Sequence, residues 1–303
     1  MADSQPNLDA ADPACSPARS GRVELKAVTM AYGQRPVFSE LSASFPAGKI
    51  SVVLGGSGCG KSTILRLIGG LSHAKSGKVE VNGENVVGLS ERNMFRVRRH
   101  LGMLFQGGAL LDSLTVYDNL ALPLREHQNL DLDTISEQVR EKLQAVGLTD
   151  VEGLLPGELS GGMAKRVALA RAIMQNPGIL LIDEPFSGLD PVSTKLIEAL
   201  LVRINRERGM TMILVSHHVP STLRMADHIV LMLPASVIQG TPKELLASDD
   251  ERVKSFLNEE IDDDSAELFN TLDAFEAEAQ PRPSRGYTPP AQPRLGRRSG
   301  RQK

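Results

Sequence analysis

Apolar runs alternate with helical patterns along the C-terminal half of the chain. Residues 50–54, 179–183 and 212–215 are predominantly apolar, which predicts buried strands. Helices are predicted at 193–208 and 221–225, between and after the later two strands. Strands and helices that alternate in this way favour an α/β fold with a mainly parallel sheet and helices on both of its faces.

Other periodic segments predict smaller units beside that sheet. Short strands are predicted at 23–25, 28–30, 41–45 and 78–83. Between residues 106 and 159 the pattern is mostly helical, and residues 132–146 carry one apolar stripe at helical spacing. No internal repeat is visible, so the strands and helices are expected to form one domain rather than an array.

Composition excludes some classes of function. The chain has 303 residues, of which 41% are hydrophobic, enough for a substantial core. Only 4% are aromatic and Trp is absent, which disfavours a surface on which nucleic-acid bases stack. The net charge of −3 argues neither for nor against nucleic acid as a partner. Cys15 and Cys59 fit neither a disulfide framework nor a zinc site. Without an apolar leader in residues 1–20 or a run of about eighteen apolar residues, we expect a soluble protein.

The two ends of the chain differ from its middle. Residues 1–21 are rich in Ala, Ser, Asp and Pro and are predicted to be disordered. Residues 249–278 hold twelve acids and two bases, with enough apolar residues for a docking helix, whereas residues 281–303 hold seven bases, five prolines and no acid. We expect the extension at 259–303 to be largely disordered, although its basic end also suits attraction to an anionic membrane leaflet. The folded domain is therefore predicted to span 22–258.

A glycine-rich segment between the first apolar strand and a helix predicts a phosphate-binding loop. Residues 55–63 read Gly-Gly-Ser-Gly-Cys-Gly-Lys-Ser-Thr and fit the pattern G-x-x-x-x-G-K-[ST]. In such a loop consecutive backbone N–H groups surround phosphates, Lys61 reaches the β- and γ-phosphates, and the Ser62 hydroxyl faces Mg²⁺. The apolar strand before it and the helix that begins near residue 64 supply the required context.

Two carboxylates follow the apolar strand at 179–183. Asp183 and Glu184 emerge at the carboxyl end of a predicted parallel strand, where open α/β sheets bind ligands. Asp183 suits a Mg²⁺ ligand, with Ser62 as the other protein oxygen. Glu184 is then the candidate general base that orients and deprotonates the attacking water.

A second glycine-containing motif begins 98 residues after Lys61. Residues 159–163 read Leu-Ser-Gly-Gly-Met and precede a helix predicted at 164–174. Ser160 can cap that helix, and the glycines let another backbone approach closely, so its N-terminus is a candidate anion site.

The two motifs, in this order, resemble the nucleotide-binding subunit of ABC transporters over residues 22–258. The resemblance implies a P-loop NTPase fold of the ABC type, with an antiparallel β subdomain and a helical subdomain at about 107–175. It implies ATP hydrolysis with Mg²⁺, coupled to an integral-membrane permease. It also implies dimerisation with a second copy of the chain, because in this family the Ser-Gly-Gly motif closes over the γ-phosphate held by the other subunit.

Further residues match family positions and take their roles from the resemblance alone. His217 matches the switch histidine that contacts the γ-phosphate, and Gln106 matches the glutamine that senses the metal and the attacking water. Asp190 matches the loop at the dimer interface, and Tyr32 matches the aromatic that stacks on adenine. His218 stands where an acidic residue is common, and the sequence gives it no role. The implied nucleotide-binding residues are Tyr32, Gly55, Gly56, Ser57, Gly58, Cys59, Gly60, Lys61, Ser62, Thr63, Ser160, Gly161, Gly162 and Asp190.

Shorter stretches resemble a particular branch of that family. Met163 replaces the usual Gln, and Met163-Ala-Lys-Arg together with residues 103–125 is similar to the ATPase of Mla-type, MCE-associated phospholipid transport systems. This resemblance implies phospholipid transport between the inner and outer membranes of a bacterium. It further implies a peripheral position on the cytoplasmic face of the inner membrane and an MCE-domain lipid-binding protein as a partner. Residues 233–236 depart from the family because they lack its usual glycine-containing hairpin turn.

Other functions remain open from the sequence. The same fold serves other cargo, such as amino-acid or ion import or solvent export. An ABC protein acting on DNA would need long arms between its motifs, but only 52 residues separate Gln106 from Leu159. A ribosome-acting member usually has two motif sets, and this chain has one, so we expect no nucleic-acid partner. A simple P-loop kinase would leave residues 159–162, Asp190 and His217 unexplained.

Overall fold

The computed structural model describes residues 21–234 and 236–260, and the account below concerns those residues. The predictions of disorder at 1–20 and 261–303, and of a docking helix beyond residue 260, lie outside them. None of the helices in the described part is both long and apolar enough to cross a membrane.

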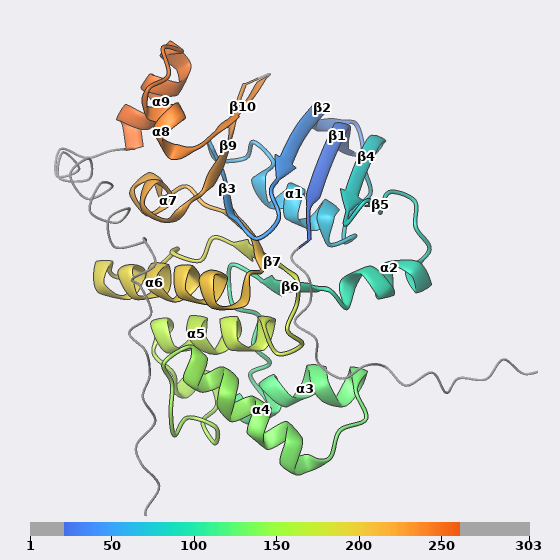
Figure 1. The fold of residues 1–303 in the computed structure, drawn as a ribbon, viewed down its shortest axis with the longest axis vertical. Coiled ribbons are helices and arrows are strands. Elements are labelled where there is room, and N and C mark those ends of the chain that lie inside the picture. Colours follow the sequence, from blue (N-terminus) through green and yellow to red (C-terminus); the bar gives the residue numbers. More distant parts are fainter. Residues whose placement is uncertain (1–20, 235, 261–303) are drawn as a thin grey trace, which may run out of the picture. The chain divides into compact units, whose positions relative to one another are not determined.

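A six-stranded sheet forms the centre of the fold (Figure 1). Its order is β10-β9-β3-β8-β7-β6, and every neighbouring pair is parallel except β10 with β9. All residues of β3, β7 and β8 are buried, because helices cover both faces and leave no polar side to alternate with. The predicted, mainly parallel sheet is confirmed. The strands are β3 (Ile50–Gly55), β6 (Leu101–Leu104), β7 (Ile179–Asp183), β8 (Thr211–Val215), β9 (His228–Leu233) and β10 (Ser236–Gly240).

A second, antiparallel sheet has the order β2-β1-β4-β5. Its strands are β1 (Val23–Tyr32), β2 (Arg35–Phe45), β4 (Ser76–Val81) and β5 (Glu84–Asn85). The strands predicted at 23–25 and 28–30 are one strand, β1, with an irregularity between them. Ala27 adopts a left-handed conformation with φ 48°, and the pairing register with β2 shifts between Leu25 and Val28. Such a bulge puts one extra residue into a strand and interrupts the alternation that the sequence shows.

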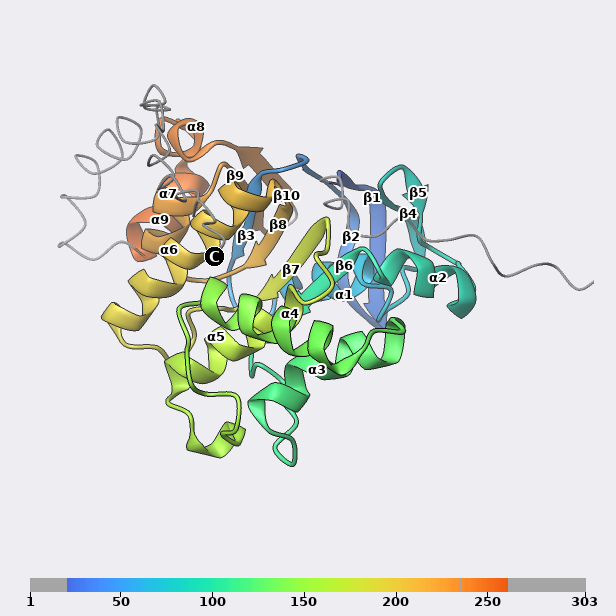
Figure 2. The same cartoon turned by 60° about the horizontal axis from the view of Figure 1, so that its bottom comes forward.

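The helix α1 (Lys61–Ile68) lies between the two sheets and contacts strands of both. It covers one face of the six-stranded sheet, whereas α6 (Pro191–Arg208) and α7 (Val219–Met225) cover the other (Figures 1 and 2). Apolar residues from both sheets and α1 form a common buried core. The remaining helices around the sheets are α2 (Glu91–Arg98), α8 (Pro242–Leu246) and α9 (Glu251–Glu260).

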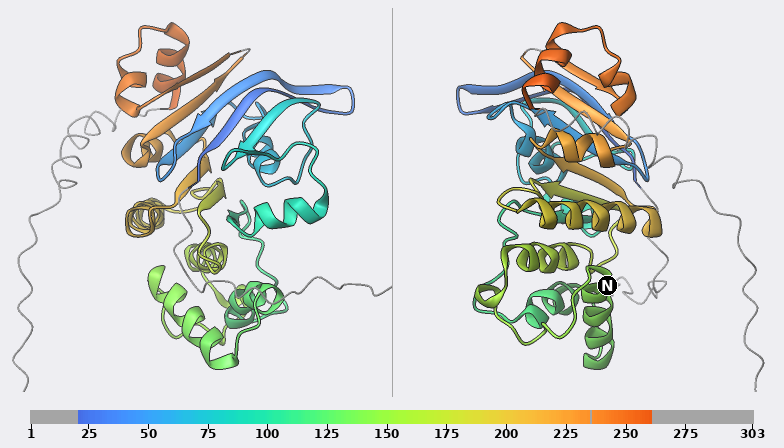
Figure 3. Two further views of the ribbon diagram at one scale, coloured as in Figure 1. Left: turned by 45° about the vertical axis from the view of Figure 1, so that its right-hand side comes forward. Right: turned by 90° about the vertical axis from the view of Figure 1, so that its left-hand side faces the viewer.

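Three further helices pack on one another in the segment predicted to be helical (Figure 3). They are α3 (Val116–His127), α4 (Leu132–Ala145) and α5 (Gly161–Ala172). Helix α5 also packs against β6, where a Cβ on Gly102 would meet the Ala172 carbonyl oxygen at 2.3 Å. Because only glycine allows this approach, Gly102 fixes how closely the helices lie to the sheet.

Helix starts differ from the sequence predictions for a local reason. Helices α6 and α7 each begin two residues earlier than predicted, with Pro at the first or second helical position. Proline there lacks only an N–H that would have no partner within the helix, and its fixed φ suits the first turn. Helix α2 was not predicted, since its eight residues bury only Met94 and Val97 and carry a weak stripe.

Candidate functional site

The phosphate-binding loop joins β3 to α1, as predicted, and glycine is required at both of its ends. Gly55 has φ 150°, and a Cβ there would lie 2.6 Å from the Met232 carbonyl oxygen. Gly60 has φ 101°, and a Cβ there would lie 2.6 Å from a methyl group of Val37. Between these fixed ends, Gly56, Ser57 and Gly58 are exposed. The loop therefore presents its backbone to solvent while its ends are anchored in the fold.

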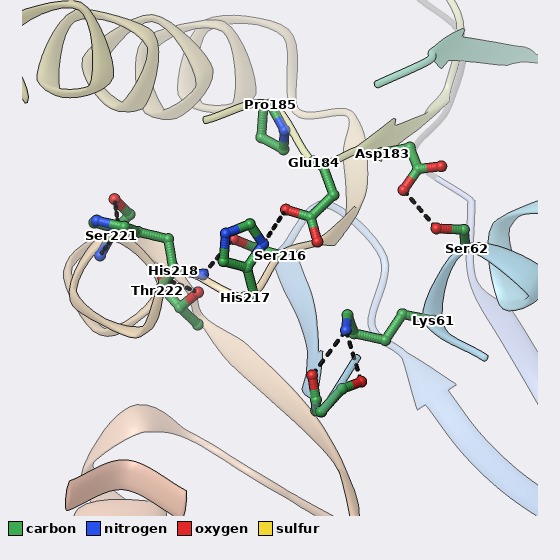
Figure 4. A network of polar contacts seen from close by, with 12 residues as sticks. Lys61, Ser62, Asp183, Glu184, Pro185, Ser216, His217, His218, Ser221 and Thr222 are labelled. Carbon is green, nitrogen blue, oxygen red and sulfur yellow. Dashed lines mark hydrogen bonds and ion pairs between the residues drawn. The ribbon is translucent and has the colours of Figure 1, made fainter. Parts of the chain in front are cut away.

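Lys61 is the first residue of α1 and is buried. Its ammonium group donates hydrogen bonds to the carbonyl oxygens of Gly55, at 2.7 Å, and Gly56, at 3.0 Å (Figure 4). A lysine ammonium group has three donors, so one remains after these two bonds. The cation is held over the loop with a donor free for a phosphate oxygen.

Ser62 and Asp183 meet although 121 residues separate them along the chain. The Ser62 hydroxyl donates a hydrogen bond of 2.8 Å to Oδ1 of Asp183, which is buried at the end of β7. A hydroxyl and a carboxylate oxygen are hard donors of the kind that Mg²⁺ prefers, and Mg²⁺ sites of NTPases use one or two protein ligands together with phosphates. The pair therefore fits the predicted Mg²⁺ ligands.

The sheet register brings Glu184 next to His217. Asp183 of β7 pairs with Val215 of β8, so the residues after each strand leave the same edge of the sheet. Nδ1 of His217 lies 2.8 Å from Oε2 of Glu184, close enough for an ion pair when the imidazole is protonated (Figure 4). The described residues give this buried oxygen no aligned hydrogen bond, so it retains lone pairs for another donor.

The backbone of Glu184 is in an unfavourable conformation. Its φ is 48°, in the left-handed region, which costs a residue with a side chain roughly 1–2 kcal/mol. The Glu184 N–H donates to the Val215 carbonyl at 2.9 Å, so the edge of the sheet helps to hold the turn. Nothing in the sequence marks this strain, because glutamate has no preference for positive φ.

Lys165 is a site residue that the sequence analysis did not identify. It lies on α5, and its ammonium group donates to the carbonyl oxygens of Glu184, at 3.2 Å, and Pro185, at 2.9 Å. Burial holds the pKa of Lys165 below its ordinary value, and the negative charge of Glu184 opposes that shift. A lysine five residues after a helix-capping serine is a weak sequence signal, since its contact arises only when α5 packs on this loop.

Ser160 caps helix α5 as predicted, but the helix begins at Gly161, three residues earlier than predicted, so both glycines lie in its first turn. The Ser160 hydroxyl accepts a hydrogen bond from the Met163 N–H at 3.2 Å, and Ser160 and Gly161 are exposed. Gly162 lies beside the start of α6, where a Cβ on it would meet Oγ of Ser193 at 3.3 Å. Ser193 in turn donates to Asp190, so the motif and the predicted dimer-interface loop are neighbours within one chain.

The other predicted residues lie apart from the group in Figure 4. Asp190 is exposed and caps α6, accepting from the N–H groups of Val192 and Ser193, and the Ser193 hydroxyl holds its pKa below the ordinary value. Tyr32 is half-exposed at the end of β1, and its hydroxyl meets side chains of α1 and of Ser72, whose hydrogen bond lowers the Tyr32 pKa. Gln106 is exposed in the loop after β6.

Cys59 and Thr63 complete the predicted loop residues. Cys59 is partly exposed, and its sulfur packs beside Gly55. Thr63 is buried in the first turn of α1. The structure therefore brings together Lys61, Ser62, Asp183, Glu184 and His217, and places the Ser160 and Asp190 motifs side by side elsewhere.

Sequence comparison places the chain among transport ATPases. A family model described as "ABC transporter" matches residues 38–187. The intermembrane phospholipid transport system ATP-binding protein MlaF of Haemophilus influenzae is 43% identical over 241 residues, which are 79% of this chain and 91% of that protein. The MlaF protein of Escherichia coli K12 is 41% identical over 78% of this chain and 88% of its own length. A probable ribonucleotide transport ATP-binding protein, mkl of Mycobacterium leprae, is 40% identical over 78% of this chain and 68% of its own.

Solved structures give the same result. The dimeric ATP-binding cassette MJ0796, in a post-hydrolysis state bound to ADP and Pi, superposes with a TM-score of 0.67 at 29% identity, over 73% of this chain and 98% of that one. The cbiO1 protein of Clostridium perfringens, part of the ABC transporter complex cbiONQ, superposes with a TM-score of 0.69 at 26% identity, over 84% of this chain and 98% of that one. The chain belongs to the ABC transporter family and is one of its ATP-binding, ATP-hydrolysing subunits.

Proposed function

We propose that this chain is the ATPase of a phospholipid transport system that connects the inner and outer membranes of a bacterium. The relatives with the higher identities, at 41–43%, are named for intermembrane phospholipid transport. In this proposal two copies of the chain bind an integral-membrane permease at the cytoplasmic face of the inner membrane, and an MCE-domain protein handles the lipid. A relative at 40% identity is named for ribonucleotide transport, so nucleotide cargo is the competing assignment.

The contact between Glu184 and His217 carries the assignment of the hydrolytic step. A general base needs a carboxylate oxygen with an unused lone pair, and Oε2 of Glu184 retains lone pairs 2.8 Å from Nδ1 of His217. In the proposed reaction Glu184 takes the proton of the attacking water, while His217 orients the carboxylate and reaches the γ-phosphate. Gln106 would sense the metal and the attacking water from the loop after β6.

The loop residues would hold the rest of the nucleotide. Lys61 would direct its remaining donor to the β- and γ-phosphates, and Tyr32 would pack on the adenine beside α1. Ser62 and Asp183 would hold Mg²⁺, which offsets the negative charge of the phosphate oxygens when it is bound.

The exposed start of α5 supports an active site shared by two chains. Ser160 satisfies one N–H of the first turn, and the N–H groups of Gly161 and Gly162 have no partner within the helix. These donors, at the positive end of the helix, suit the γ-phosphate held by a second copy. The dimeric cassette with TM-score 0.67 is a structural precedent for such pairing.

The loop between Gln106 and α3 is tied to α5, which supports coupling to a permease. Arg171 of α5 donates to the carbonyl oxygens of Ala109, at 2.8 Å, and Gly108, at 3.0 Å. Asn119 of α3 is fully buried and exchanges hydrogen bonds with the Leu111 backbone. Movement of this loop by a membrane partner would therefore be passed to the helix that carries Ser160.

The first experiment measures ATP binding and turnover in purified variants. Glu184→Gln keeps the size of the side chain but removes the base, so ATP should still bind while turnover falls at least about a hundredfold. Lys61→Ala should weaken ATP binding, because the cation over the loop is lost. Glu207→Gln, at an exposed carboxylate near the end of α6, is the matched control and should behave as wild type. Near-normal turnover in Glu184→Gln would exclude this residue as the base.

The second experiment identifies partners and cargo. The tagged chain is purified from membranes of its host in mild detergent, and co-purifying proteins and lipids are identified by mass spectrometry. We expect a permease, an MCE-domain protein and bound phospholipid. The purified complex in vesicles should then move labelled phospholipid in the presence of ATP, and the Glu184→Gln complex should not. Recovery of a permease with a nucleotide-binding protein, and ATPase stimulation by ribonucleotides instead, would favour the competing cargo.

A further inference from the structure

His218, which has no part in the reaction proposed above, lies at the junction between the loop that carries His217 and the start of helix α7. It follows His217 and caps helix α7, its Nδ1 accepting a hydrogen bond of 3.1 Å from the Ser221 N–H (Figure 4). Its own N–H donates to the buried Ser216 hydroxyl at 3.0 Å. The backbone of His217 is thus held between two anchored neighbours, and one anchor depends on an imidazole nitrogen.

The same nitrogen makes a second contact that competes with the first. Nδ1 of His218 lies 2.5 Å from the Ser221 hydroxyl oxygen, and that hydroxyl also lies within hydrogen-bond distance of Oε1 of Glu198. A serine hydroxyl has one proton and an ionised carboxylate only accepts, so a hydroxyl that donates to Glu198 must accept from Nδ1–H. An Nδ1 that carries a proton cannot accept from the Ser221 N–H. The two arrangements therefore exclude each other, and the position of one proton selects between them.

The arrangement in which Nδ1–H donates to Ser221 involves Glu198 of α6, and the His218 ring also lies near the loop after Glu184. Glu198 is buried on α6, and Arg224 of α7 binds it through two nitrogens, at 3.0 Å and 2.6 Å. The ring of His218 lies 6.0 Å from the ring of Phe186, two residues after Glu184. A change at His218 would consequently reach α6, whose first residue follows Asp190, and the segment that holds the base.

We propose that His218 is a positioning residue for ATP hydrolysis, which holds the switch histidine in place only while its Nδ1 is unprotonated. When Nδ1 gains a proton it donates to Ser221, Ser221 donates to Glu198, and the cap of α7 is lost. His217 then loses one of its two anchors. This inference rests on the proposed roles of His217 and Glu184.

The charges around His218 influence the pH at which its imidazole gains a proton. Glu198 of α6 favours a protonated imidazole, whereas Arg224 of α7, paired with Glu198, opposes it. Glu184 and His217 face the junction from the two loops. Helix α7 also packs against β3, which has no titratable residue, and α9, whose Arg252 and Lys254 pair with nearby acids. Histidine changes charge between about pH 5 and 8, so turnover should fall as the pH falls through that range.

The test compares pH profiles of kcat for the wild type, His218→Asn and His218→Ala. Asparagine is a good helix cap that does not titrate, so His218→Asn should keep kcat near neutral pH and lose most of the acid decline. Alanine removes the cap, so His218→Ala should lower kcat about tenfold at neutral pH with little change in KM for ATP. The other titrating groups of the site are common to all three proteins. An acid decline in His218→Asn as steep as that of the wild type would overturn the proposal, as would a wild type without a decline.

A measurement on the wild-type chain guards against variants that fold poorly. Nitrogen chemical shifts of ¹⁵N-labelled histidine report which ring nitrogen carries the proton, and His218 is assigned by the signal that His218→Asn lacks. We expect an unprotonated Nδ1 above neutral pH and a protonated one in acid, whereas an Nδ1 that keeps its proton throughout contradicts the proposal. Failure of the Glu184→Gln experiment would refute the reaction itself, so the two inferences fail separately.

Discussion

Lys165 contacts the loop that carries Glu184, the proposed general base. Its ammonium group binds the carbonyl oxygens of Glu184 and Pro185, directly beside the left-handed backbone of Glu184. Charged hydrogen bonds of this kind contribute about 1.5–3 kcal/mol each, enough to offset the cost of the left-handed conformation. Lys165 thus links the helix of one glycine motif to the base that follows β7.

We predict that Lys165→Met lowers kcat about tenfold or more while KM for ATP stays within about twofold, because the base is misplaced and the phosphate loop is untouched. Lys165→Arg should retain more activity, since a guanidinium can donate to the same two carbonyl oxygens. Steady-state ATPase assays at saturating and limiting ATP separate the two constants. A Lys165→Met variant that loses ATP affinity instead of turnover would show that the lysine acts on the nucleotide.

Cys59 offers a chemical probe of the phosphate loop. Its thiol is partly exposed inside residues 55–63, so we predict that bulky alkylation blocks ATP binding and that bound MgATP slows the alkylation. The assay follows modification by mass spectrometry in a Cys15→Ser background, where Cys59 is the remaining thiol. Cys59→Ser in that background is the control and should bind ATP normally. Equal alkylation rates with and without MgATP would contradict the placement of ATP on this loop.

Motif residues were predictable from sequence, and residues that act through packing were not. The meeting of Ser62 with Asp183 follows from a loop pattern and an acid-ended strand, both of which are local. Lys165 was missed because its contacts depend on how α5 packs against the loop after β7. His218 was given no role because its cap of α7, although local, was not recognised in the sequence. The left-handed conformation of Glu184 is a property of the folded edge of the sheet and has no counterpart in its residue type.

At the scale of helices and strands, the accuracy of the predicted bounds depended on whether the residues that cap or interrupt each element were recognised. Ser160, Asp190 and His218 each cap a helix, but the sequence analysis used only the first as a cap, and all three helices were predicted to begin two or three residues late. The bulge at Ala27 divided one strand into two predicted strands. Strongly apolar strands such as β7 were predicted at their observed bounds, since burial on both faces leaves one continuous run.

The loop between β6 and α3 is held by hydrogen bonds to one buried side chain, that of Asn119. The Asn119 side chain donates to the carbonyl oxygens of Leu111, Leu114 and Thr115 and accepts from the Leu111 N–H. Asn119→Ala removes all of these side-chain hydrogen bonds and empties a fully buried position, so we predict a loss of about 1–3 kcal/mol of unfolding free energy and a Tm lower by several degrees. Asn129→Ala, at an exposed position between α3 and α4, should leave the Tm unchanged. Equal melting temperatures for both variants in thermal unfolding would contradict this role.

At the scale of the whole molecule, one chain carries two groups of motif residues, which we propose belong to different shared sites. The phosphate loop and the Glu184–His217 pair lie together, whereas the Ser160 motif lies beside Asp190 at the start of α6. The family resemblance implies that the two groups complete different sites, and this assignment stays a prediction. The exact cargo and the terminal extensions could not be predicted as well, since the ATPase motifs do not contact the cargo and the ends carry no motif.

We predict that two inactive variants restore activity when their subunits mix. Ser160→Arg keeps its own Lys61, and Lys61→Ala keeps its own Ser160, so one of the two sites of a mixed dimer has both residues intact. Each variant alone should be nearly inactive, and the mixture should gain ATPase activity under conditions that allow subunit exchange. Positive helix ends act only over the first turn, so no distant residue is expected to replace Ser160. No gain on mixing would contradict a site shared between chains.

The left-handed backbone of Glu184 has a consequence for how the protein can be stabilised. At most positions alanine is more favourable than glycine, because glycine loses more conformational freedom on folding. At position 184 both substitutions remove the carboxylate, but only glycine relieves the φ of 48°. Glu184→Gly should therefore melt about 2–4 °C above Glu184→Ala, which corresponds to about 1 kcal/mol. In a selection for thermal stability alone, glycine would therefore be favoured over alanine at position 184, although neither residue could act as the proposed general base.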